Sequence, residues 1–99
     1  MFDAVVLGEN GRVEEIQVKQ ADARSNWVWG AFKMPGHVLH ELCRLWQQPD
    51  RGDEYIGTLV NAWLAQGHEA VGIKAGVSYV DVGTLGGYRE AIALLGGAP

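Results

Sequence analysis

Residues 3–19, DAVVLGENGRVEEIQVK, decide the expected fold of the N-terminal part of the chain. Residues 3–7 are mostly β-branched and apolar, residues 8–11 contain two glycines and an asparagine, and residues 12–19 form a second extended run. In that second run, polar positions are interspersed with the apolar residues Val13, Ile16 and Val18. This pattern predicts a β-hairpin with a glycine-bearing loop.

The remaining elements follow from apolar periodicity and from the glycines and prolines that interrupt it. We expect, in chain order, a strand over 26–34, a helix from Pro35 to before Pro49, a helix between Asp53 and Gly67, strands over 69–75 and 77–82, and a last helix capped by Thr84. Gly30, in the middle of the first of these strands, indicates a close approach of another backbone. The order β-β-β-α-α-β-β-α predicts an α/β protein, bordering on α+β, with a mixed sheet of about five strands.

The expected helices each have one apolar face, which predicts its burial. In the first helix, Cys43 lies between Leu42 and Leu45 and is interpreted as a small buried hydrophobic residue. In the second, we expect Asp53 to cap the N-terminus and Gly67 to end the helix. The expected buried side of the last helix consists of Tyr88, Ala91, Ile92 and Leu95.

Length and charge exclude several classes of function. The 99 residues predict one domain over 1–99, and the single cysteine excludes an internal disulfide. The formal net charge of -4, with lysines and arginines scattered along the chain, argues against nucleic-acid binding. The sequence has neither a basic-then-apolar leader pattern nor an apolar run of about 20 residues. We therefore expect a cytoplasmic protein that binds neither nucleic acid nor membrane.

The candidate site residue that stands out is Asp81, in the stretch YVDVGTLGGY at residues 79–88. It lies towards the end of an apolar run and directly before a glycine-rich helix start. Carboxylates at strand ends can hold Mg²⁺ together with phosphate oxygens, which makes Mg²⁺ the candidate cofactor. The alternative is a structural role, in which Asp81 accepts hydrogen bonds from the backbone amides of Gly83 and Thr84.

Four stretches together resemble the C-terminal half of the sugar-1-phosphate nucleotidyltransferases, the nucleoside-diphosphate-sugar pyrophosphorylases. They are DAVVLGENGRVEEIQVK, SNWVWGAFKMP, RGDEYIGTLVNAWLAQG and YVDVGTLGGYREAIALL, and they cover almost the whole chain. The family joins a nucleoside triphosphate to a sugar 1-phosphate with Mg²⁺ held by two aspartates. The resemblance implies that Asp81 corresponds to the second of these aspartates and that Lys19 contacts the sugar phosphate. It further implies that Asn26 and Gly30 lie near the sugar pocket, with sugar phosphates or nucleotide sugars as candidate ligands.

The departures from the family pattern count against its activity. The family's nucleotide-binding half, with its glycine-rich loop and first metal aspartate, has no counterpart in this sequence. Val18 and Gln20 replace the acidic residue and the proline that flank the lysine, and residues 85–87, Leu-Gly-Gly, replace a Pro-Glu-Asp step. A neutral valine cannot accept the hydrogen bonds from sugar hydroxyls that a carboxylate would accept.

Three interpretations remain open from the sequence. The first is a catalytically silent half-domain that acts as a small binding or self-associating module. It would form a homodimer through the neighbourhood of Trp27 and Trp29, which share one face of an expected strand. The second is a split subunit that needs a separate nucleotide-binding partner to be active. The third is a piece of a longer enzyme.

Overall fold

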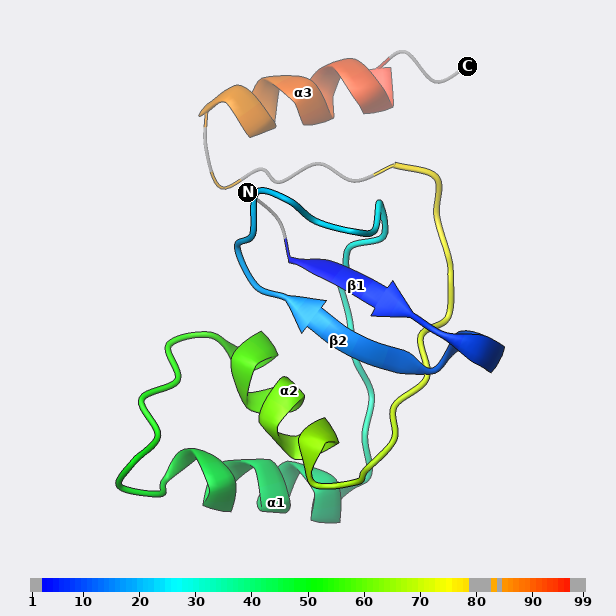
Figure 1. The fold of residues 1–99 in the computed structure, drawn as a ribbon. Coiled ribbons are helices and arrows are strands. Elements are labelled where there is room, and N and C mark those ends of the chain that lie inside the picture. Colours follow the sequence, from blue (N-terminus) through cyan, green and yellow to red (C-terminus); the bar gives the residue numbers. More distant parts are fainter. Residues whose placement is uncertain (1–2, 79–82, 84, 97–99) are drawn as a thin grey trace.

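The computed structural model describes residues 3–78, 83 and 85–96. Over these residues the chain is a small α+β protein with a two-stranded antiparallel sheet and three α-helices (Figure 1). The elements are β1 (Ala4–Leu7), the 3₁₀ turn η1 (Glu9–Gly11), β2 (Val13–Gln17), α1 (Gly36–Trp46), α2 (Ile56–Ala65) and α3 (Leu85–Gly96). Figure 1 shows α2 between the hairpin and α1, with α3 on the other side of the hairpin.

The predicted β-hairpin is confirmed. β1 and β2 pair with Val5 opposite Ile16, and the register shifts by one residue between Val6 and Leu7. The turn is closed by the Gly8 amide, which donates to the Arg12 carbonyl oxygen at 2.7 Å. Asn10 (φ 58°) and Gly11 (φ 74°) both adopt left-handed backbone conformations, which asparagine and glycine tolerate better than other residues.

The prediction of a mixed sheet of about five strands is wrong. Residues 26–34 meet β1 only at the bridge between Ala4 and Val28, where the Val5 amide donates to the Trp27 carbonyl oxygen. Residues 69–75 meet the hairpin only around the bridge between Arg12 and Val71. Of the strand expected over 77–82, residues 79–82 lie outside the described residues.

Glycines explain why these apolar runs do not extend into full strands. Gly72 and Gly76 interrupt the run over 69–78, and Gly76 has a φ of 81°, which L side chains rarely adopt. A strand preference reflects packing against neighbours more than it reflects the backbone itself. Val77 is fully exposed and has no such neighbour in the part of the chain that the structure describes.

Helices α1 and α2 form as predicted and pack against each other. Their shared core consists of Leu42, Leu45, Leu59 and Trp63. The Trp63 indole donates from Nε1 to Glu41 Oε2 at 3.2 Å, so the buried indole has a polar partner on α1. Cys43, expected to be buried, is exposed. It follows Leu42 by one residue, and one residue turns the side chain by about 100° around the helix.

The sequence also made a prediction for each end of α2, a cap at Asp53 and a stop at Gly67. Gly67, with a φ of 100°, follows α2 and suits its expected role as the stop. The prediction that Asp53 caps α2 is wrong, because Tyr55 is the residue that precedes the helix and no side chain caps it. Asp53 instead takes part in the connection between α1 and α2.

The face of α2 that meets β2 carries Gly57 and Asn61, four residues apart. The Asn61 amide pairs with both backbone groups of Ile16: the Ile16 N–H donates to Oδ1, and Nδ2 donates to the Ile16 carbonyl oxygen, each at 2.7 Å. A Cβ on Gly57 would lie 2.5 Å from Val18 Cγ2 and 3.1 Å from Ile16 Cγ2. The close approach of another segment, which the sequence predicted at Gly30, occurs at Gly57 instead. Gly30 faces open space.

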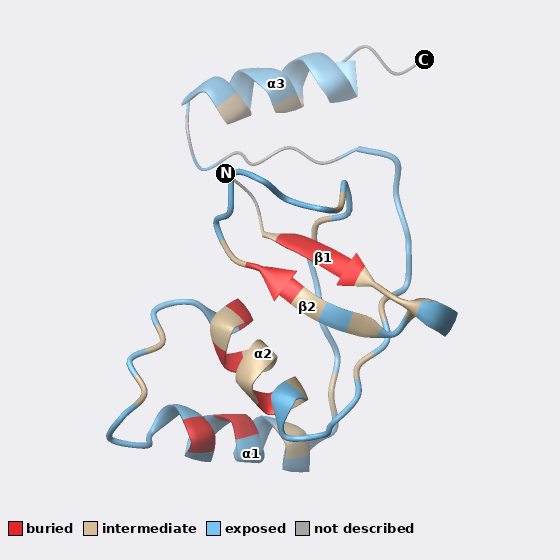
Figure 2. Cartoon of the chain, in the orientation of Figure 1, coloured by how far each residue is buried: buried red, intermediate tan, exposed pale blue. Residues whose placement is uncertain are grey.

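Helix α3 forms close to its expected position, but the prediction of a buried side is wrong. None of its described residues is buried, and Tyr88, Ile92 and Leu95 are all exposed (Figure 2). The capping residue expected here, Thr84, lies outside the described residues. In the described ranges, none of the helices has both the length and the apolar character needed to cross a membrane.

Gly57→Ala tests the contact between α2 and β2. The added methyl group would overlap Val18, whose branched side chain has little rotamer freedom, so the free energy of unfolding should fall by about 1–3 kcal/mol. Gly36→Ala, in the first turn of α1 with open space around it, is the matched control. It should leave stability unchanged or raise it by up to about 1 kcal/mol. Urea unfolding measures both, and equal stability of the two variants would contradict the close contact.

Candidate functional site

Lys19 lies just beyond β2 in a left-handed conformation, with a φ of 53°. Its backbone N–H donates to Asp3 Oδ1 at 3.2 Å, and its Nζ lies 5.6 Å from the centre of the Tyr55 ring. This distance is within the range of a cation–π contact. The contacts place Lys19 beside the residue that precedes α2.

Asn26 and Gly30, the other two residues predicted to lie near a sugar pocket, are both exposed. Gly30 has open space on the side where a Cβ would be. The contacts given above for Lys19 involve neither of them. Asp81 lies outside the described residues, so Mg²⁺ binding at Asp81 stays a prediction.

Val18, which stands where the resemblance leads us to expect an acidic residue, has a packing role in this chain. Its Cγ2 lies against Gly57 on α2, and the residue is partly buried. A carboxylate at this position would face α2 and the side chain of Ile16 instead of open solvent. A valine at position 18 therefore fits the interior of this fold.

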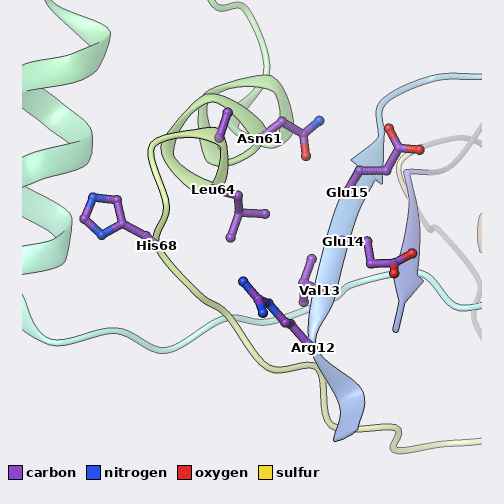
Figure 3. Close-up of a pocket in the computed structure, with 8 residues that line it drawn as sticks. Arg12, Val13, Glu14, Glu15, Asn61, Leu64 and His68 are labelled. Carbon is purple, nitrogen blue, oxygen red and sulfur yellow. The ribbon is translucent and has the colours of Figure 1, made fainter. Parts of the chain in front are cut away.

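A cavity of about 460 Å³ opens between β2 and α2 (Figure 3). Val13, Leu64 and Ala65 supply apolar parts of its lining, while Arg12, Asn61 and His68 contribute polar side chains. Binding sites for small molecules combine such apolar walls with a few convergent polar groups.

The polar groups around this cavity have partners elsewhere. Arg12 Nη1 lies 3.4 Å from Glu69 Oε1, and the Asn61 amide is bound to Ile16. The His68 ring stacks on Trp63 with ring centres 4.5 Å apart, and Figure 3 shows it directed towards α1.

The carboxylates of the two glutamates that line the cavity also lie against other parts of the chain. Glu14 Oε2 lies against Gly8, and Glu15 forms an ion pair with Arg24. Since these groups do not converge on the space, we assign it no ligand.

Sequence reasoning missed the polar cluster formed by Arg51, Asp53 and Thr58. Arg51 donates from Nε to Asp53 Oδ1 at 2.7 Å and from Nη2 to Oδ2 at 2.5 Å, a two-bond arrangement that suits guanidinium and carboxylate. Thr58 donates from Oγ1 to Asp53 Oδ2 at 2.7 Å. The Asp53 side chain is only 6% exposed. The Arg-Gly-Asp stretch at residues 51–53, which places the two charged partners close together in the sequence, was the signal that a polar cluster could form here.

These hydrogen bonds shift the pKa values of both charged partners. The hydrogen bond from Arg51, followed by that from Thr58, lowers the pKa of Asp53 below its ordinary value. The same bond to Asp53 raises the pKa of Arg51. A carboxylate that stays ionised and accepts hydrogen bonds on both oxygens suits a structural link between α1 and α2 better than it suits acid–base chemistry.

Metal binding has no candidate in the described ranges, where no three His, Cys, Asp or Glu side chains gather closely enough to hold an ion.

Comparison with known proteins gives no family for the chain. No family model matches it, and neither a curated protein nor a solved structure is significantly similar to it.

Asp53→Asn tests the structural role of the Arg51–Asp53–Thr58 cluster. Because the folded-state pKa of Asp53 is lowered, its contribution to stability is present above the unfolded pKa of about 3.9 and is lost as pH falls through the folded value. The variant should therefore melt a few degrees below wild type near neutral pH, and the difference should shrink below about pH 4.

The control for this variant is Asp50→Asn, which removes an exposed carboxylate from the same connection. Its melting temperature should stay close to that of wild type near neutral pH. A difference between Asp53→Asn and wild type that does not change with pH would contradict the role of the ionised carboxylate.

Proposed function

We propose that this chain is a non-catalytic module that associates with a second copy of itself. The observation that carries the proposal is the apolar surface left uncovered by the single chain. In α3, the exposed fractions of Leu85, Tyr88, Ile92 and Leu95 lie between 54% and 75%. Contiguous apolar surfaces of this kind are typical of protein interaction sites.

The interior of the chain supports the same proposal. Among the described residues, no large side chain is completely buried, and the buried apolar residues divide between the hairpin and the α1–α2 pair. A small core leaves a small margin of stability. Covering the exposed apolar residues with a second copy would add burial that the single chain lacks.

The resemblance to sugar-1-phosphate nucleotidyltransferases enters the proposal as a sign of descent without activity. Val18 packs against α2 at the position where the family has an acid. The five-stranded sheet expected from the sequence, whose strand ends would place ligand groups along one edge, does not form, and the sheet over the described residues has two strands. Both observations favour a role in association over phosphoryl transfer.

Sedimentation equilibrium of the purified chain tests the proposal. We expect a dimer at concentrations in the tens of micromolar, and raising the salt concentration should not dissociate it because apolar contacts are not screened. A monomer throughout this range would contradict self-association. Thermal stabilisation by Mg²⁺ with a sugar 1-phosphate, lost in Asp81→Asn, would instead favour the split subunit.

A further inference from the structure

Residues 73–78 form an exposed segment outside the helices and strands, on the path from the hairpin towards α3 (Figure 1). Ile73 is 89% exposed, and Val77 is fully exposed. Within the part of the chain that the structure describes, no backbone group of residues 73–78 donates or accepts a hydrogen bond. A protease binds the backbone of its substrate directly, so it cuts most easily where the chain is exposed and free of such bonds.

The hairpin holds the chain only as far as Gly72. The Val13 amide donates to the Ala70 carbonyl oxygen at 2.8 Å, and the Gly72 amide donates to the Gly11 carbonyl oxygen at 2.7 Å. The last buried residue among those described is Trp63, on α2. A cut after residue 73 would therefore leave the hairpin, α1, α2 and their packing in one piece.

We propose that the Lys74–Ala75 peptide bond is a proteolytic processing site, cut by an endoprotease that takes a lysine side chain into an acidic pocket. One water molecule is added across the bond, so that Lys74 gains a carboxylate and Ala75 gains an amino group. The products are a folded unit, residues 1–74, and a C-terminal part that contains α3. This inference goes beyond the proposed self-association and does not depend on it.

Four of the other basic residues lie where the backbone is held. Arg44 and Arg89 are inside α1 and α3, so a protease would have to unwind a helix to reach their peptide bonds. Arg12 forms the bridge to Val71. Arg51 is bound to Asp53 through two hydrogen bonds, which keeps its guanidinium out of a protease pocket.

The remaining three basic residues are Lys19, Arg24 and Lys33, and each has anchored backbone or anchored neighbours. The Lys19 amide donates to Asp3, and the Arg24 amide donates to Gln17 Oε1 at 2.6 Å. Lys33 lies between Phe32, whose ring stacks on Trp29, and Met34, which packs on the α1–α2 core. Among the eight lysines and arginines, Lys74 therefore has the most accessible peptide bond.

The Lys74 side chain is covered by an aromatic ring, although its backbone is free. Its Nζ lies 5.3 Å from the centre of the Trp27 ring, within the range of a cation–π contact. The lysine must leave this ring before it can enter the pocket of a protease. We therefore expect Trp27 to slow the cut, which makes the ring part of the processing site.

Limited digestion of the full chain with trypsin tests the proposal, at a concentration at which the chain is monomeric. The first products, identified by intact mass, should be residues 1–74 and 75–99. Trp27→Ala should raise the rate of this cut about two- to fivefold, because it removes the cation–π contact. Trp29→Ala, whose ring stacks on Phe32 and not on Lys74, is the matched control and should leave the rate close to that of wild type.

The fate of the product separates a processing site from general unfolding. Residues 1–74 should keep the melting temperature of the full chain within a few degrees, since they contain every buried residue of the described chain. A first cut at any other basic residue, or a product 1–74 that unfolds, would overturn the proposed site. Equal rates for Trp27→Ala and wild type would overturn the role of the Trp27 ring.

Discussion

The contact between α2 and β2 is the interaction on which the rest of the structure depends. The side-chain amide of Asn61 occupies both hydrogen-bonding groups of Ile16, so it takes the place that a neighbouring strand would have. Gly57 lets the helix come close enough for this pairing. Without the contact, two backbone groups of the hairpin would lose their partners, and an unpaired buried group costs about 1–3 kcal/mol.

Helix α2 also connects the two apolar clusters of the chain. One of its faces meets the hairpin at Gly57 and Asn61, and another packs on α1 through Leu59 and Trp63. The Arg51–Asp53–Thr58 cluster holds the connection between α1 and α2 beside the N-terminus of α2. The described part of the fold is therefore organised around α2, although the hairpin is the strongest signal in the sequence.

Sequence patterns predicted the hairpin and the helices, because the causes of these elements are local, whereas the three further strands that they predicted did not form over the described residues. The glycine-bearing turn and the strands beside it gave the hairpin, and the spacing of apolar residues gave the helices. Sequence patterns did not predict which elements would meet. The sequence does not distinguish Gly30 from Gly57. Only the tertiary packing brings another segment of the chain close to Gly57 and leaves open space at Gly30. An apolar helix face also predicts burial within the chain, whereas the large apolar residues of α3 stay exposed.

The candidate site was less predictable, for a related reason. Lys19, Asn26 and Gly30 were selected by resemblance to a family, and the five-stranded sheet expected from the sequence does not form over the described residues. The network around Asp53 depends on Arg51 and Thr58 reaching the same carboxylate, which no spacing rule specifies. The proposed self-association rests on the uncovered apolar surface, because a chain with so thin a core would gain stability by covering it.

The most direct test of this account is hydrogen exchange at the Ile16 amide, measured by NMR. If the Asn61 side chain occupies this group, the amide exchanges only when α2 separates from the hairpin, and its protection should approach that of the buried amides of α2. If the Ile16 amide exchanges as fast as those of exposed loop residues, α2 is not held on β2 and the account is wrong.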